Sequence, residues 1–132
     1  FDISNCSTQR NLSEDGELQA LKIGKFFKEN DIKLTKVLSS EWCRCKDTAK
    51  IAFGNYETKN FLNSFYDERF SENKDKQILD FQKFIRNWNK SGNLVLVTHY
   101  VVISEILDLT TSSGEIIITD TNLKFLSSLE IN

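Results

Sequence analysis

The chain has 132 residues, enough for one domain with one hydrophobic core and too few for two. Hydrophobic residues make up 39% and charged residues 27%, a balance typical of a soluble globular protein and not of a disordered one. The net charge is −2, and the lysines and arginines are spread along the chain, which argues against a nucleic-acid partner because that needs clustered cations. No apolar run approaches the length of a membrane-spanning helix, so we expect no membrane partner.

Three cysteines, Cys6, Cys43 and Cys45, accompany a single histidine. This set does not favour zinc, because C-x-C is not the usual ligand spacing and no second pair follows. The thiols are either small buried residues, or Cys6 forms a disulfide with one of the other two in an oxidising compartment. Cys43 and Cys45 point to nearly opposite sides of a helix, so at most one of them faces Cys6.

Helical spacing of apolar residues predicts four helices. Ser13 is the expected N-cap of the first, followed by the acidic Glu14 and Asp15, and Ser40 is the expected cap of the second. The predicted helices cover residues 14–30, 41–53, 74–89 and 101–109.

Strand signals alternate with these helices, which predicts a layered α/β domain with a mainly parallel sheet. Residues 36–40 form the first strand, and a short strand is expected at 60–62. The apolar run 94–97 indicates a strand buried on both faces. Residues 115–119 and 124–131 flank a polar turn and predict an antiparallel hairpin at the sheet edge.

Two predicted strands are followed by residues that suit an anion. Arg44 lies in the first turn after strand 36–40, and His99 lies at the tip of strand 94–97. Ligands of open α/β sheets gather beyond the carboxyl ends of the strands. An arginine offers a planar fork of donors to phosphate, and imidazole bonds an oxygen or moves a proton. Either residue alone is commonly structural, whereas their joint placement favours a phosphoryl site.

Three segments resemble the histidine phosphatase superfamily, the phosphoglycerate-mutase-like proteins. Residues 39–49, SSEWCRCKDTA, resemble the family's SSPxxRAxxTA, with Glu41 at a frequent proline position. Residues 12–20, LSEDGELQA, are similar to its LTxxGxxQA helix start. LVTH at 96–99 resembles the strand that carries the second histidine, and CSTQRNLS with WCRC is similar to a branch of small, often exported bacterial members.

The resemblance implies a three-layer α/β sandwich with helices on both faces of the sheet. It implies a phosphomonoester hydrolase that needs no metal or cofactor and acts through a phosphohistidine. Arg44 matches the family's second arginine and His99 its second histidine, both binding the phosphoryl group, and Arg10 lies in a loop that borders the pocket. The implied partner is a phosphorylated small molecule or a phosphoprotein. A mutase is disfavoured, because no longer insertion for holding phosphoglycerate is present.

A leaving-group acid is less well defined. Many relatives use a carboxyl group from the middle segment for this step. Asp67 and Glu68 are the candidates, with Glu72 behind them, and the alternative for all three is a solvated loop charge.

The main departure from the family is at the front of the chain. His99 is the only histidine, so the family's nucleophile and its RHG arginine are absent from these 132 residues. The chain begins with Phe1 instead of Met and shows no signal peptide, so we expect one domain over 1–132 that lacks its first strand. This chain is then predicted to be inactive and prone to self-association through unpaired edges.

Three points stay open at this stage. One alternative to the phosphatase is a non-catalytic phosphate-binding module, and another is a structural α/β protein without an anion site. The resembling branch implies export or a periplasmic location, with the cytoplasm as the alternative.

Overall fold

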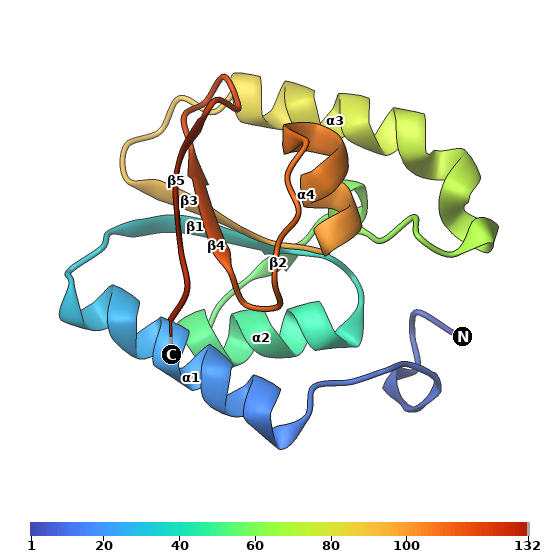
Figure 1. Ribbon diagram of the computed structural model, residues 1–132, viewed down its shortest axis with the longest axis horizontal. Coiled ribbons are helices and arrows are strands. Elements are labelled where there is room, and N and C mark those ends of the chain that lie inside the picture. The colour runs from blue at the N-terminus through green and yellow to red at the C-terminus, as the bar shows by residue number, and fades with distance from the viewer. Residues whose placement is uncertain (132) are drawn as a thin grey trace.

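The computed structural model describes residues 1–131 and has the predicted α/β architecture. Helices α1 (Glu14–Glu29) and α2 (Cys43–Phe53) lie on one side of a central sheet, and α3 (Lys74–Arg86) and α4 (Tyr100–Leu107) lie on the other (Figure 1). The helix positions agree with the apolar spacing, and the Ser13 side chain caps α1 by accepting a hydrogen bond from the Gly16 N–H at 3.1 Å. Within residues 1–131, no helix combines the length and apolar character needed to cross a bilayer.

The central sheet is parallel and has three strands in the order β2-β1-β3. These are β1 (Leu34–Ser39), β2 (Glu57–Thr58) and β3 (Asn93–Val97). The predicted antiparallel hairpin is present at the C-terminal end, formed by β4 (Ile116–Thr119) and β5 (Phe125–Leu129). It forms a separate two-stranded sheet, so the hairpin does not continue the hydrogen-bond ladder of β3.

The hairpin is attached to both helix layers. Gln19 on α1 donates a hydrogen bond to the Ser113 carbonyl at 3.1 Å, just before β4. On the other side, Leu123 in the hairpin turn packs against the main core cluster.

Strand β3 has a free edge, because within residues 1–131 it pairs only with β1. The prediction that this strand is fully buried on both faces is wrong, because Leu94 to Val97 are only half-buried. The cause is its position at the edge of the parallel sheet, where no neighbouring strand covers one flank.

Two local predictions are also wrong. Ser40 does not cap α2, which begins at Cys43 with Trp42 in the N-cap position. The expected strand at 60–62 is instead the 3₁₀ turn η2 (Asn60–Leu62), while the strand β2 lies just before it. Phe61 and Leu62 are adjacent and both buried. In a strand with one buried face, neighbouring side chains point to opposite faces, so both could not be buried there. Two other short 3₁₀ turns are η1 (Cys6–Thr8) and η3 (Glu68–Asn73).

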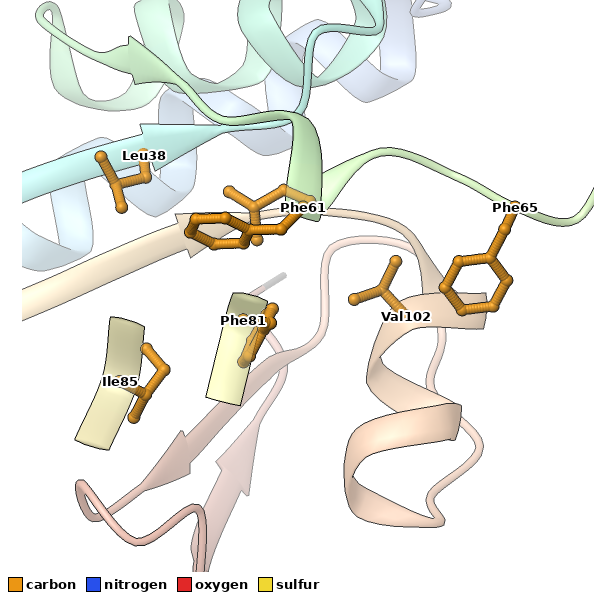
Figure 2. Close-up of a cluster of buried hydrophobic side chains, with 7 residues drawn as sticks. Leu38, Phe61, Phe65, Phe81, Ile85 and Val102 are labelled. Carbon is orange, nitrogen blue, oxygen red and sulfur yellow. The ribbon is translucent and has the colours of Figure 1, made fainter. Parts of the chain in front are cut away.

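The main core lies between the sheet and the α3–α4 layer (Figure 2). Its buried members come from β1, from η2 and the loop after it, and from the inner faces of α3 and α4. They are Leu38, Phe61, Leu62, Phe65, Phe81, Ile85 and Val102. This layer holds the β1 end and the loop from Phe61 to Phe65 in a fixed relation, and both contribute to the site described below.

Helices α1 and α2 approach each other closely at Gly24. A methyl group added there would lie 2.3 Å from the Ala52 carbonyl oxygen, far inside van der Waals contact. We expect Gly24→Ala to lower the free energy of unfolding by about 2 kcal/mol, because the two helix backbones must move apart. Urea unfolding measures this change.

The matched control for this substitution is Gly16→Ala in the same helix. Its added methyl group would meet the end of the Leu12 side chain at 3.2 Å, and that side chain can turn away. We expect Gly16→Ala to be neutral or slightly stabilising, since alanine favours a helix over glycine by up to about 1 kcal/mol. An equal loss in both variants would contradict a tight contact at Gly24.

Candidate functional site

The carboxyl ends of β1 and β3 lie side by side. Ser39 is paired with Val97 in the parallel register, and the Ser40 N–H donates to the Val97 carbonyl at 2.9 Å. This pairing places Ser40 beside His99 immediately beyond the strands. The two residues predicted to bind a phosphoryl group, Arg44 and His99, therefore meet at one edge of the sheet, as the sequence indicates.

His99 is buried, with 6% of its surface exposed, and both ring nitrogens have polar neighbours. Its Nε2 lies 2.8 Å from the Ser40 hydroxyl, and its Nδ1 lies 3.2 Å from Nη2 of Arg44. The Sγ atom of Cys45 lies 3.6 Å from Nε2. The ring is thus held from β1 and α2 together, and Arg44 is the cation in contact with it.

Burial and, to a smaller extent, the Arg44 guanidinium together lower the pKa of His99 to about 3. The imidazole is therefore neutral near pH 7 while Arg44 carries the positive charge. An oxyanion that enters beside Nδ1 meets one fixed cation and one neutral ring.

A second set of hydrogen bonds connects the ring to the loop after η2. The Ser40 hydroxyl lies 3.1 Å from Oδ1 of Asn63, and the Trp42 N–H donates to the same hydroxyl at 3.1 Å. Asn63 is in turn fixed against Glu41 by two hydrogen bonds, both 2.8 Å long. The backbone carbonyl of Asn63 accepts from Gln77 of α3 at 2.9 Å, which secures this loop to the core.

Aromatic side chains cover the His99 ring. Trp42 packs edge-on against it with ring centroids 5.4 Å apart, and Phe1 and Phe70 pack on Trp42 at 4.9 and 5.4 Å. We refer to Phe1, Trp42 and Phe70 as the aromatic cover. These rings limit water at His99 and contribute to the burial that keeps the ring neutral.

The N-terminal segment is joined to α2 by a disulfide between Cys6 and Cys43. The Cys43 N–H also donates to the Gln9 side chain at 2.9 Å. Cys45 is the remaining thiol and is buried, and this burial raises its pKa to about 11. The pairing decides between the two partners that the sequence left open for Cys6, and Cys45 is a protonated structural thiol at neutral pH.

The other predicted residues are not among the hydrogen-bond partners of Arg44 or His99. Arg10 is exposed in the loop before α1, and Glu68 is exposed at the start of η3. Asp67 caps η3 and forms an ion pair with Arg69 at 2.9 Å, and these hydrogen bonds lower its pKa to about 2. A carboxyl group held ionised in this way has no proton for a leaving group, which argues against Asp67 as the acid.

No metal site is apparent in the part of the chain that the structure describes, where no three His, Cys, Asp or Glu side chains gather. Two surface hollows, of about 270 and 380 Å³, lie along α1 and α2 and contain neither Arg44 nor His99. The candidate site is therefore described by its polar contacts beneath the aromatic cover.

Sequence reasoning missed three contributors to this site. Asn63 lies in a segment without periodicity or motif, so no local signal marks it. Ser40 was assigned to a helix cap, and its contact with His99 depends on strand pairing across 59 positions. Trp42 gave the one usable signal, a large aromatic residue directly before the cysteine and arginine of the motif.

The lowered pKa of His99 predicts a specific acid sensitivity. Between its ordinary pKa of 6.5 and about 3, the unfolded chain binds a proton that the folded protein does not. The stabilisation is therefore complete above pH 6.5 and declines as pH falls through this window. We expect a loss of about 2 kcal/mol in the free energy of unfolding between pH 7 and pH 5. Urea unfolding at both pH values measures it.

The control for this prediction is His99→Gln, which keeps a polar side chain and removes the titration. We expect the variant to be less stable at pH 7 but to change less between pH 7 and pH 5. An identical pH dependence in the two proteins would mean that another group causes the acid sensitivity.

The fold of this chain is similar to that of several solved structures. The chain is similar to the crystal structure of TTHB049 from Thermus thermophilus, with a TM-score of 0.66, 17% identity, and coverage of 92% of this chain and 85% of that one. It is also similar to the protein histidine phosphatase SixA, solved in complex with tungstate, with a TM-score of 0.63, 14% identity, and coverage of 92% and 84%. No protein-family model and no curated protein matches the sequence. At these identities the likeness establishes a shared fold and nothing about activity.

Proposed function

We propose that Arg44 and His99 bind the phosphoryl group of a phosphomonoester, and that the domain belongs to a phosphatase acting through a phosphohistidine. The observation that carries the proposal is the 3.2 Å contact between Nη2 of Arg44 and Nδ1 of His99 at the adjacent ends of β1 and β3. A guanidinium provides parallel donors for phosphate oxygens, and the starts of α2 and α4 add further anion-seeking dipoles. The substrate is a phosphorylated small molecule or a phosphoprotein.

The likeness to SixA supports an oxyanion ligand for this fold. That protein was solved with tungstate, a tetrahedral oxyanion of phosphate-like charge and shape. Tungstate is therefore a suitable probe for this chain.

The nucleophile is proposed to lie on a segment outside these 132 residues. His99 is the only histidine, and both of its ring nitrogens are already engaged, by Ser40 and by Arg44. The free edge of β3 is suited to pairing with one further strand, which would bring its carboxyl end beside the site. In this proposal the 132-residue chain binds the anion but does not hydrolyse it.

An oxidising compartment fits the disulfide between Cys6 and Cys43, because such bonds are rare in reducing cytosol. We therefore propose export or a periplasmic location for the protein. Arg10 remains a proposed contributor to the pocket border, which its exposed position beside the Cys6 segment allows.

The test combines turnover with anion binding. We expect no p-nitrophenyl phosphate hydrolysis by the 132-residue chain, a rise in its melting temperature with tungstate, and hydrolysis once the upstream coding sequence is restored. Hydrolysis by the short chain that disappears in His99→Ala would make His99 the nucleophile. No stabilisation by tungstate would contradict the phosphoryl site.

A non-catalytic phosphate-binding module is the second candidate. The observation that favours it is the neutral, doubly hydrogen-bonded state of His99, which suits binding better than attack on phosphorus. This candidate predicts stabilisation by tungstate and no hydrolysis even by the extended chain, so the same experiment separates the two.

A further inference from the structure

The hydrogen bonds around His99 determine which ring nitrogen carries the proton, beginning at Asn63. The Glu41 backbone N–H can only donate, and it lies 2.8 Å from Oδ1 of Asn63. The Asn63 amide nitrogen lies 2.8 Å from the Glu41 carboxyl oxygen Oε1, which suits a donor. Turning the amide over would oppose donor to donor and acceptor to acceptor, so Oδ1 of Asn63 is fixed as an acceptor.

This fixed acceptor sets the direction of the Ser40 hydroxyl. The hydroxyl must donate its one proton to Oδ1 of Asn63, 3.1 Å away. The Trp42 N–H occupies one lone pair of the same oxygen at 3.1 Å. The remaining lone pair faces Nε2 of His99 at 2.8 Å, so Nε2 must carry a hydrogen and donate it.

The opposite side of the ring gives the same answer independently. The Arg44 guanidinium has donors and no acceptor, and its Nη2 lies 3.2 Å from Nδ1. Nδ1 must therefore present a lone pair, because an Nδ1–H would oppose two donors. Both ends of the ring select the neutral form protonated at Nε2.

We propose that Ser40 and Asn63 are positioning residues that hold His99 with its Nδ1 lone pair beside Arg44, so that the site takes up a phosphoryl group together with one proton. The inference rests on the proposed function and deepens it, because it specifies the protonation state of the ligand. A phosphomonoester dianion would place a bare oxygen against the Nδ1 lone pair and be repelled. The monoanion donates its P–OH hydrogen to Nδ1 while Arg44 binds the ionised oxygens.

No covalent bond is made or broken in this binding step. One proton accompanies the phosphoryl group and lies in the hydrogen bond between Nδ1 and a phosphoryl oxygen. Linkage then requires the apparent affinity to fall about tenfold for each pH unit above the second pKa of the ligand.

Few other titratable groups face the His99 ring. From α2 they are Arg44 and the thiol of Cys45, whose pKa of about 11 keeps it protonated over the useful range. The Glu41 carboxylate does not contact the ring itself; it accepts a hydrogen bond from the Asn63 side-chain amide, which lies between them. The ion pair of Asp67 and Arg69 on η3 is separated from His99 by the rings of Trp42 and Phe70. A proton taken up with phosphate is therefore assigned to the contact at Nδ1.

The tautomer can be read directly by nitrogen-15 NMR, because His99 is the only histidine and gives the only imidazole signals. We expect the native protein to show the Nε2–H form at neutral pH. In Asn63→Ala the Ser40 hydroxyl is released and can donate to Nε2, while Arg44 still favours a lone pair on Nδ1. The Nδ1–H form should therefore appear as a second population beside the Nε2–H form. A native spectrum dominated by the Nδ1–H form would refute the inferred tautomer and leave the proposed phosphoryl binding unaffected.

The matched control is Ser64→Ala, one residue along the same loop. Its hydroxyl accepts only the Tyr66 N–H at 3.2 Å and has no contact with Ser40 or His99. Ser64→Ala also removes a hydrogen bond from this loop, as Asn63→Ala does, but it should keep the native tautomer. An equal tautomer shift in both variants would reduce Asn63 to a structural residue and refute its positioning role.

Binding of inorganic phosphate at several pH values gives the functional readout. For the native protein and Ser64→Ala, we expect the tenfold loss per pH unit, and for Asn63→Ala a weaker dependence, since an Nδ1–H can donate to the dianion. Binding that is independent of pH in the native protein would refute the proton coupling and leave the proposed function intact. An absence of phosphate binding would refute both.

Discussion

Removing the disulfide between Cys6 and Cys43 is expected to lower the free energy of unfolding by about 4 kcal/mol. The bond closes a loop with a sequence separation of 37, so it withdraws a large amount of chain entropy from the unfolded state. Other contacts of the folded protein also keep the two sulfurs close together, among them the packing of Phe1 on Trp42 and the hydrogen bond from the Cys43 N–H to the Gln9 side chain. The loss should therefore appear almost in full.

The measurement is urea unfolding of the oxidised protein, of the protein in excess dithiothreitol, and of the double variant Cys6→Ala with Cys43→Ala. The variant should match the reduced protein and be unaffected by reductant, because the remaining Cys45 is buried and unpaired. A reduced protein as stable as the oxidised one would show that the N-terminal segment detaches without the bond and that its packing, such as that of Phe1 on Trp42, contributes little to stability.

The elements with strong local signals were predictable from the sequence. Helix α1 follows from its Ser13 cap and apolar spacing, and the meeting of Arg44 with His99 follows from two strands ending at one sheet edge. The extent of β3 was predicted within one residue, but its burial was not, because burial depends on which strands lie beside it.

The environment of His99 was not predictable, because it is built by contacts between distant segments. Ser40 reaches His99 across the β1–β3 pairing, and Asn63 reaches Ser40 through a loop held by Gln77. Whether the Ser40 hydroxyl caps a helix or contacts the His99 ring depends on which polar groups the fold brings close to it. Local sequence offers both roles for a serine at a strand end.

Arg44→Gln is expected to weaken tungstate binding by about 10- to 100-fold, the effect of losing a charged hydrogen bond of about 1.5–3 kcal/mol. Arg44 is the cation in contact with His99, so no neighbouring group replaces its charge. Thermal unfolding in a series of tungstate concentrations measures the change. Arg86→Gln, the same substitution at an exposed position on α3, is the control and should bind as the native protein does.

The same substitution separates the two causes of the lowered His99 pKa. Burial, the larger cause, remains in Arg44→Gln, whereas the repulsion from the guanidinium disappears. The pKa of His99 should rise but stay below 6.5, so the acid-induced loss of stability becomes smaller without vanishing. A glutamine amide can accept as well as donate, so only Ser40 and Asn63 would then constrain the ring. Persistence of the Nε2–H form in this variant would show that they suffice, and a mixture of tautomers would show that Arg44 is required.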